Sequence, residues 1–361
     1  MFDDLRLFAL SESRTAGSAI ADALNVDLAD HVEYDFNDGE HKTRPSVNVR
    51  GKDVFVVQPL YDDPEKSIND KLCRLLFFCG ALHDASADRV TVVAPYLCYQ
   101  RSDRKTQPRD PITTRYIAGL LESVGVDRML TIDVHNLAAF QNSFRCRTDH
   151  LEARPLFVRR LAGEVGDRPV VVVSPDEGGM KRANRFAKGL RKRLGRNVPT
   201  AFVEKFRSGQ DLSGGTLVGD VDGAVAVIVD DLIGTGGTIC QATRACVRGG
   251  AEGVVAAVTH GVFVGDASEK LTLPELDAIY VTNTIPPFRL AGSPVMDKLT
   301  VCDVSERFAA AIRAIHAGGS VTTLNEMDNA ARHADADPGD DGRASPKTAQ
   351  SAVQAEPNLT P

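Results

Sequence analysis

Short runs of apolar, mostly β-branched residues constrain the fold of this chain more than any other feature. They occur at 53–58, 90–95, 129–134, 170–174, 224–231, 254–260 and 278–283. Runs of this length that are apolar on both faces are typical of strands buried in a parallel sheet. Stretches with helical periodicity separate them. This alternation predicts an α/β fold with mainly parallel sheets flanked by helices.

The clearest helical pattern is DPITTRYIAGLLESVG at 110–125. Asp110 is a candidate N-cap, Pro111 suits the first turn, and Gly125 suits the end of a helix. The apolar residues that share one face of this predicted helix are Ile117, Leu120, Leu121 and Val124.

The strand–helix alternation runs through the chain twice, which predicts two α/β domains of similar size. We place the first at 1–150 and the second at 151–321. From about Thr322 the sequence is polar and rich in Ala, Asp and Pro. Such a segment buries too little apolar surface to offset its chain entropy. We therefore expect 322–361 to be a disordered tail without a catalytic role.

Composition excludes several classes of function. The chain has 361 residues, 43% of them hydrophobic, and a net charge of -7. This balance gives no overall attraction for nucleic acid or for an acidic membrane surface. The basic run at 181–196 is either a solvated helix face or an anion-binding or subunit surface.

The cysteines indicate a reducing compartment. There are seven, an odd number, and they are scattered without a C-x-x-C pair, which argues against a disulfide framework or structural zinc. The first residues do not read as a signal peptide, and no apolar run approaches the ~20 residues needed to cross a bilayer. We expect a cytoplasmic protein.

The segment VIVDDLIGTGGTI at 227–239 carries the main functional signal. Its loop of Gly and Thr, placed before a helix, supplies backbone N–H groups for a phosphate. The preceding Asp230 and Asp231 can accept hydrogen bonds from sugar hydroxyls. A tight turn with solvated acids is the alternative, but the full pattern favours a ligand such as ribose 5-phosphate, which carries both a phosphate and a diol.

Several motifs together resemble one family. VIVDDLIGTGGTI is similar to the phosphoribosyl-diphosphate loop of type I phosphoribosyltransferase folds. FNDGE, PYLCYQRSDRKTQPRDPIT, TIDVHN, VVSPDEGGMKRA and VTNTIPP occur in the order found in the ribose-phosphate diphosphokinase family. The resemblance covers roughly residues 5–320. It implies two tandem phosphoribosyltransferase-type domains, a dimer-based homo-oligomer that can reach a hexamer, and diphosphoryl transfer from Mg-ATP to the 1-hydroxyl of ribose 5-phosphate.

The resemblance also assigns roles to individual residues. Asp133, His135 and Asp176 are implied in binding Mg²⁺, and FNDGE resembles an ATP-binding loop that one subunit lends to its neighbour, although it is also compatible with a plain Asp-Gly turn. Lys205 and Arg207 match the catalytic loop. The ATP-binding residues implied are Phe36, Asp38, Gly39, Glu40, Arg101, Ser102 and His135. Those implied in ribose 5-phosphate binding are Arg207, Asp230, Asp231, Gly234, Thr235, Gly236, Gly237 and Thr238.

The chain departs from the family pattern in three places. Ser102 stands where Gln is common, Gly234 stands where Asp is common, and the segment at 136–150 is unlike its usual counterpart. The last departure leaves hexamer geometry and control by phosphate or ADP open. Two other functions also remain open, namely a non-catalytic regulatory partner of a synthetase and a phosphoribosyltransferase that consumes the diphosphate product.

Overall fold

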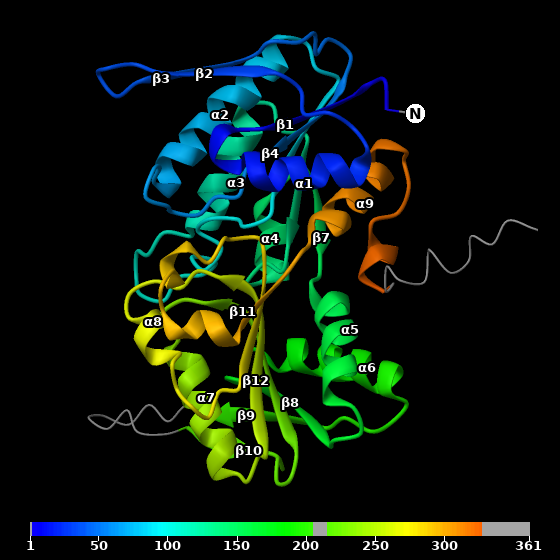
Figure 1. The fold of residues 1–361 in the computed structure, drawn as a ribbon. Helices are drawn as coiled ribbons and strands as arrows, with labels where there is room; N and C mark the ends of the chain where they lie inside the picture. The colour runs from blue at the N-terminus through cyan, green and yellow to red at the C-terminus, as the bar shows by residue number, and fades with distance from the viewer. Residues whose placement is uncertain (1, 205–214, 327–361) are drawn as a thin grey trace, which may run out of the picture. The chain divides into compact units, whose positions relative to one another are not determined.

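The computed structural model describes residues 2–204 and 215–326, and two parallel sheets organise them (Figure 1). The strands are β1 Leu5–Ala9, β2 His31–Asp35, β3 His41–Pro45, β4 Asp53–Val57, β5 Arg89–Ala94, β6 Arg128–Ile132, β7 Arg147–Leu151, β8 Val170–Ser174, β9 Thr200–Glu204, β10 Thr216–Val218, β11 Val225–Ile233, β12 Gly253–Gly261, β13 Ala278–Thr282 and β14 Leu299–Cys302. The helices are α1 Arg14–Leu24, α2 Ile68–Asp84, α3 Thr113–Ser123, α4 Leu137–Ser143, α5 Arg154–Val165, α6 Met180–Leu194, α7 Gly237–Arg248, α8 Ala267–Lys270 and α9 Ser305–His316.

The first sheet has the order β1-β4-β5-β6-β7, and all its neighbours are parallel. Strand β4 shows why its sequence is apolar throughout. Phe55 and Val57 pack into one core with α1, whereas Val54 and Val56 pack into another with α2 and α3. Because successive side chains of a strand point to opposite faces, a sheet covered on both sides needs apolar residues at every position.

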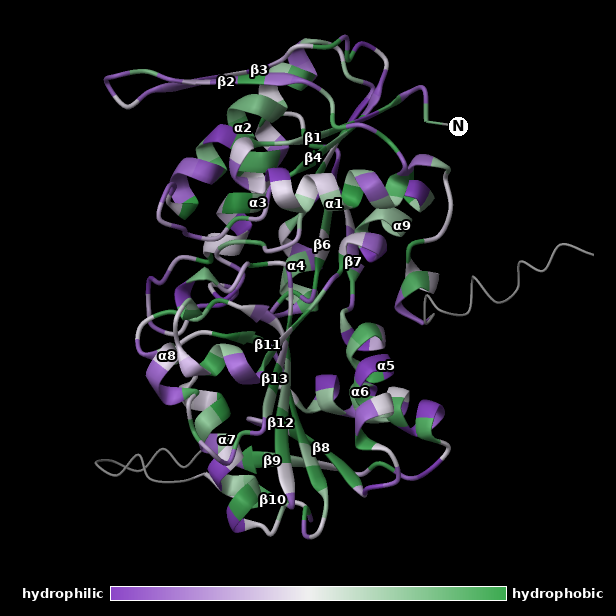
Figure 2. Cartoon of the chain, in the orientation of Figure 1, coloured by the Kyte–Doolittle hydropathy of each residue, from purple (hydrophilic) through white to green (hydrophobic). Residues whose placement is uncertain are grey.

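The second sheet has the order β10-β9-β8-β11-β12-β13-β14, in which only the β10–β9 pairing of the described strands is antiparallel. Helices α5 and α6 share a core with one face, and α7 and α8 share a core with the other. The central strands β8, β11 and β12 are accordingly hydrophobic along most of their length (Figure 2). Both predicted features, the α/β class and the parallel sheets flanked by helices, are confirmed.

Helix α9 follows the last strand of the second sheet but packs against α1, which belongs to the first. Phe308 and Ile312 of α9 lie in the same core as Ile20 and Leu24 of α1. The first sheet is therefore covered partly by residues from the far end of the described chain. The predicted boundary at residue 150 stays a prediction, and α9 complicates it.

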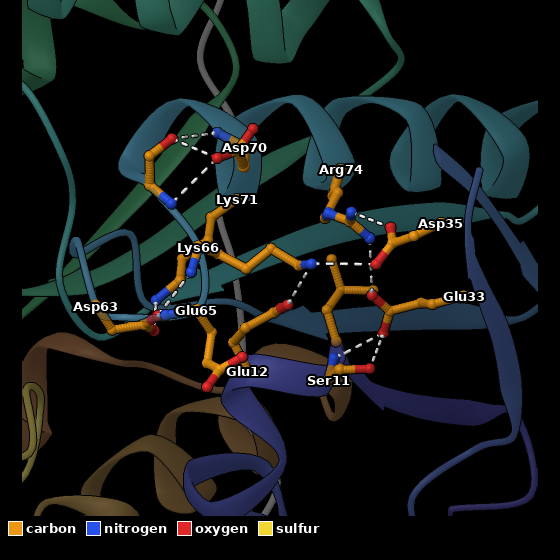
Figure 3. A network of polar contacts seen from close by, with 12 residues as sticks. Ser11, Glu12, Glu33, Asp35, Asp63, Glu65, Lys66, Asp70, Lys71 and Arg74 are labelled. Carbon is orange, nitrogen blue, oxygen red and sulfur yellow. Dashed lines mark hydrogen bonds and ion pairs between the residues drawn. The ribbon is translucent and has the colours of Figure 1, made fainter. Parts of the chain in front are cut away.

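A hairpin of β2 and β3 lies outside both sheets, and a polar network contacts its strand β2 (Figure 3). Arg74 of α2 pairs with Asp35 and lies 3.9 Å from Glu33. Glu33 accepts hydrogen bonds from the backbone N–H and hydroxyl of Ser11, at 2.6 and 2.8 Å. Lys66 adds a contact to Asp35 at 3.1 Å. These polar contacts thus hold strand β2 against helix α2 and against the segments that contain Ser11 and Lys66.

The helix predicted at 110–125 is shorter than expected. It begins at Thr113 after an Ile112 cap and ends at Ser123. Asp110 is not its N-cap, because that carboxylate accepts hydrogen bonds from Thr106 and from the backbone N–H of Gln107 in the preceding turn. Leu120 is also exposed rather than part of the buried face.

The predicted tail begins too early. Residues Thr322–Asn325 form a 3₁₀ helix, and Leu324 is buried. The side-chain oxygen of Asn325 accepts from the Glu152 N–H at 2.9 Å, and its amide donates to the His150 carbonyl at 2.8 Å. The remainder of the predicted tail, 327–361, lies outside the described residues.

Candidate active site

A cavity of about 1170 Å³ is lined by loops from both sheets. The first sheet contributes the segments after β5 and β6, and the second contributes the segments after β8 and β11. These segments leave the carboxyl ends of parallel strands, where open α/β sheets bind their ligands. The predicted site residues that the cavity brings together are Arg101, Asp133, His135, Asp176, Asp230, Asp231, Gly234, Thr235, Gly236, Gly237 and Thr238.

The acid pair lies within strand β11 rather than at its mouth. The strand continues past both acids to Ile233, pairing with β12 as far as Gly261. The two carboxylates nevertheless differ in exposure. The side chain of Asp231 is 2% exposed and that of Asp230 is 20% exposed.

Arg182 and His135 contact these two acids. Arg182 donates from Nη1 to Asp230 Oδ1 at 2.8 Å, and its Nη2 lies 2.9 Å from Asp231 Oδ1. His135 Nδ1 lies 2.8 Å from Asp231 Oδ2. Burial alone would raise the pKa of Asp231, but the hydrogen bond to His135 and the charge of Arg182 hold that pKa below its ordinary value. Burial and the neighbouring Asp231 raise the pKa of Asp230.

The loop that follows is the predicted phosphate loop. Helix α7 begins at Gly237, and its first-turn N–H groups have no partner within the helix. Gly236 caps it with a φ of 78°, and a Cβ there would lie 2.9 Å from Leu271 Cγ, so this position needs glycine. The hydroxyls of Thr235 and Thr238 lie at the same end. A helix N-terminus of this kind favours anions, and the role of this loop in binding phosphate stays a prediction.

Residues two positions apart share a face in a regular strand, which would place Asp133 and His135 together, but the structure does not show this. Strand β6 ends at Ile132, and Asp133 turns the chain with a φ of 42°. Its Oδ2 accepts from the Ala153 N–H at 2.8 Å and from the Thr259 hydroxyl at 2.6 Å. Asp133 therefore links the ends of the two sheets, and its predicted role in metal binding stays a prediction.

The first sheet supplies basic and amide side chains. Arg101 and Arg104 line the cavity. Asn136 donates to Asp103 at 2.7 Å, and its side-chain oxygen accepts from the Ala139 N–H, which caps α4. The buried Gln100 accepts from the His135 N–H at 2.8 Å. These contacts join the loops after β5 and β6, and His135 reaches Asp231 of the second sheet.

Some predicted residues lie elsewhere. Ser102 does not line the cavity, and its backbone N–H donates to the Tyr99 carbonyl. The loop between β2 and β3, with Phe36, Asp38, Gly39 and Glu40, does not line it either, and Phe36 is 42% exposed. Lys205 and Arg207 lie outside the described residues.

The chain is similar to proteins of one known family. Residues 5–125 match a model of the N-terminal domain of ribose phosphate pyrophosphokinase, and 199–326 match the phosphoribosyl synthetase-associated domain. The ribose-phosphate pyrophosphokinase 1 of Streptococcus pyogenes is 35% identical over 333 residues, covering 91% of this chain and 99% of that protein. The chain belongs to the ribose-phosphate pyrophosphokinase family.

Two further family members agree with this assignment. The ribose-phosphate pyrophosphokinase of Parasynechococcus marenigrum is 38% identical over 322 residues, covering 89% of this chain and 93% of that one. The crystal structure of the phosphoribosylpyrophosphate synthetase from Mycobacterium smegmatis has a TM-score of 0.78 and 34% identity, and the match covers 88% of this chain and 100% of that one. The predicted family, the tandem phosphoribosyltransferase-type fold and the enzyme class of ribose-phosphate pyrophosphokinases are confirmed.

Several residues in or beside the cavity of this pyrophosphokinase were not predicted from the sequence. Arg182 lies in the basic run that was interpreted as a helix face or an anion-binding surface, but it contacts two acids instead. Gln100 and Thr259 each hold a residue of the site through one hydrogen bond. The sequence carries one indication of this role. Arg182 is a cation in the first turn of a helix, shortly after the Asp-Glu-Gly-Gly turn.

Proposed function

We propose that this chain transfers the diphosphoryl group of Mg-ATP to the 1-hydroxyl of ribose 5-phosphate, giving 5-phosphoribosyl 1-diphosphate and AMP. One observation carries the proposal. The acid pair Asp230–Asp231 and the phosphate loop 235–238 line the same cavity as Arg101 and His135 from the other sheet. A sugar phosphate and a nucleotide can therefore meet in one place.

Ribose 5-phosphate fits the second sheet's side of the cavity. Its phosphate would accept hydrogen bonds from the N–H groups at the start of α7 and from the hydroxyls of Thr235 and Thr238. Its 2- and 3-hydroxyls would donate to Asp230 and Asp231. The 1-hydroxyl then remains free to face the segments of the first sheet.

ATP fits the first sheet's side. Arg101 and Arg104 supply positive charge for its phosphates. The loop with Phe36, Asp38 and Glu40 is a candidate adenine-binding element, but it does not line its own chain's cavity. We therefore propose that a second copy receives this loop, which makes the functional unit a homo-oligomer built from dimers.

Mg²⁺ fits the site as a partner of the substrate phosphates. Among the described residues, no three His, Cys, Asp or Glu side chains lie close enough together to hold a metal ion by themselves. Asp176 lines the cavity, whereas Asp133 uses one oxygen to accept two hydrogen bonds. Mg²⁺ in nucleotide sites is usually held by one or two carboxylates and by phosphates. Asp176 and His135 are the residues that would face it, and the ion would neutralise charge on the triphosphate.

The protein's own chemical contribution is positioning and charge stabilisation. The 1-hydroxyl attacks the β-phosphorus in line, and AMP leaves. Negative charge grows on the non-bridging oxygens and on the leaving phosphate, so cations placed there lower the barrier. We propose that Lys205 and Arg207, which follow strand β9 in the sequence, supply this charge. The reacting groups gain further rate from being held close together.

An assay of the purified protein for AMP formation that depends on ribose 5-phosphate tests the proposal. Lys205→Ala should lower kcat by roughly 100-fold or more, as is usual when a group that stabilises the transition state is removed. Lys188→Ala, at an exposed position of α6, serves as the control. Wild-type protein that binds both substrates but forms no AMP would instead support a regulatory partner. Release of a nucleobase product without ATP would support a phosphoribosyltransferase.

We also propose that the protein works in the cytoplasm. Its seven cysteines are all free, as is usual under reducing conditions. In the described part of the chain, no helix combines the length and apolar character that a membrane span requires. Fractionation of cells that produce a tagged protein would test this location.

A further inference from the structure

Arg182 occupies a position that local helix energetics disfavour. It is the third residue of α6, and the first turn of that helix contains no acidic residue. The N-terminal end of a helix carries partial positive charge, so a cation there is destabilising unless something compensates. Burial also works against the charged form of Arg182, but nearby acids keep its pKa above the ordinary value. The compensating negative charge comes from Asp230 and Asp231 of strand β11.

The contacts of Arg182 use the shape of its guanidinium. Nη1 donates to Asp230 Oδ1 at 2.8 Å, and Nη2 lies 2.9 Å from Asp231 Oδ1. One planar group thus spans two successive carboxylates. A lysine ammonium is a single point charge and does not present two donors in a fixed fork. The geometry is therefore specific for arginine.

The remaining contacts of the acids complete the arrangement. The Asp231 N–H donates to Asp230 Oδ1 at 2.9 Å, so this oxygen receives two donors. Both oxygens of Asp231 are engaged, one by Arg182 and the other by His135 at 2.8 Å. Without the cation, two neighbouring carboxylates in a largely buried strand would repel each other. Arg182 offsets part of that repulsion and holds the orientation of both groups.

We propose that Arg182 is a positioning residue for sugar recognition, which holds Asp230 and Asp231 so that they read the hydroxyls of ribose 5-phosphate. The inference rests on the proposed function and extends it, because it names a residue that touches the acids rather than the sugar. It also predicts a consequence for specificity. A site built around hydroxyl acceptors discriminates strongly against a sugar that lacks one hydroxyl, and this discrimination should depend on Arg182.

The experiment compares wild type with Arg182→Ala and Arg182→Lys, and uses Lys188→Ala on the same helix as a control. Calorimetry gives affinities for ribose 5-phosphate, 2-deoxyribose 5-phosphate and ATP, and steady-state kinetics give kcat and KM. Arg182→Ala should weaken binding of ribose 5-phosphate about tenfold or more and reduce its preference over the deoxy sugar by a similar factor. The affinity for ATP should stay within about twofold. Arg182→Lys should restore part of the affinity but less of the preference, since it keeps charge without the fork.

Two results would overturn the inference. One is an unchanged preference for ribose 5-phosphate over the deoxy sugar in Arg182→Ala or, should that variant not fold, in Arg182→Lys. The other is an equal loss of affinity for ATP and for the sugar, which indicates a merely structural role. Wild-type protein that binds ribose 5-phosphate yet forms no AMP would overturn the proposed reaction, while the binding constants would still decide the role of Arg182. Wild type that binds neither sugar would overturn both.

Discussion

His135 Nδ1 lies 2.8 Å from Asp231 Oδ2, and this contact joins two residues that are 96 positions apart in the chain. His135 belongs to the loop after β6 of the first sheet, and Asp231 belongs to β11 of the second. Together with the Thr259–Asp133 hydrogen bond at 2.6 Å, the contact connects the ends of the two sheets at the floor of the cavity.

The His135–Asp231 contact should make stability depend on pH. The hydrogen bond to Asp231 raises the pKa of His135 above the ordinary value of 6.5, although burial opposes the shift. The folded state therefore gains stability below pH 6.5 and loses that gain as the pH rises through the higher folded-state pKa. At low pH, His135→Asn should lower the free energy of unfolding by up to about 1 kcal/mol, a small effect because the side chain is partly exposed. At high pH the loss should be smaller. Urea unfolding at several pH values measures the difference, and a difference that does not change with pH contradicts the prediction.

Asn325 should stabilise the fold although it lies in the segment expected to be disordered. Asn325→Ala removes the side-chain bonds to the Glu152 N–H and to the His150 carbonyl. Leaving these backbone groups without partners should lower the free energy of unfolding by about 1–3 kcal/mol. Glu326→Ala, at the exposed neighbouring position, should change it by less than about 0.5 kcal/mol. Equal urea midpoints for the two variants would show that the segment is not anchored as described.

Glycine should be required at one position of the phosphate loop and replaceable at another. Gly236→Ala places a Cβ 2.9 Å from Leu271 Cγ in a backbone with a φ of 78°. It should destabilise the fold by about 1–3 kcal/mol and weaken binding of ribose 5-phosphate. Gly234→Ala is the steric control, because no atom lies within 4 Å of a Cβ there. Thermal unfolding and calorimetry of both variants test this contrast, and similar losses of stability would refute it.

The open space at Gly234 leads to a separate prediction. Gly234→Asp introduces the acid that is common in the family. No atom lies within 4 Å of the Cβ that the substitution adds. If the position faces the sugar, an added carboxylate should lower the KM for ribose 5-phosphate by several-fold, as a hydrogen bond to a charged group is worth about 1.5–3 kcal/mol. Gly234→Asn separates the hydrogen bond from the charge. A KM that rises in both variants would place this residue away from the sugar hydroxyls.

Mixed oligomers can show whether the β2–β3 hairpin acts on a second subunit. Phe36 lies on the hairpin loop, outside the cavity of its own chain. Phe36→Ala and Lys205→Ala should each be nearly inactive. In a heterodimer, one site would combine the intact Phe36 of one chain with the intact Lys205 of the other. Co-production of the two variants with different tags should therefore restore AMP formation in the doubly tagged fraction, whereas an inactive doubly tagged fraction would assign both residues to one chain.

The sequence predicted the parts of the fold that depend on local pattern. Strand β8 occurs at Val170–Ser174, as expected from its apolar run. The hairpin β2–β3 was not predicted because its strands are polar and are held by Arg74 and its acidic partners rather than by a core. Asp110 was misassigned because a turn and a helix compete for the same kind of carboxylate, and only the fold decides between them.

The candidate site likewise contains residues that the local sequence predicts and residues that only the fold brings together. The phosphate loop was predictable because glycine, threonine and the acids are adjacent in the sequence. Arg182 was not, because its partners lie 48 residues further along the chain and its exposure depends on how α6 packs beside β11. Asp133 was placed on a strand face because its φ of 42° is invisible in the sequence.

Helix α9 gives the order of synthesis a physical consequence. The apolar side of α1, with Ile20 and Leu24, is covered by Phe308 and Ile312, which the ribosome adds nearly 300 residues later. A nascent chain that has completed the strands of the first sheet still carries an uncovered hydrophobic stripe. The first half therefore gains the packing of α9 against α1 only when the last helix emerges.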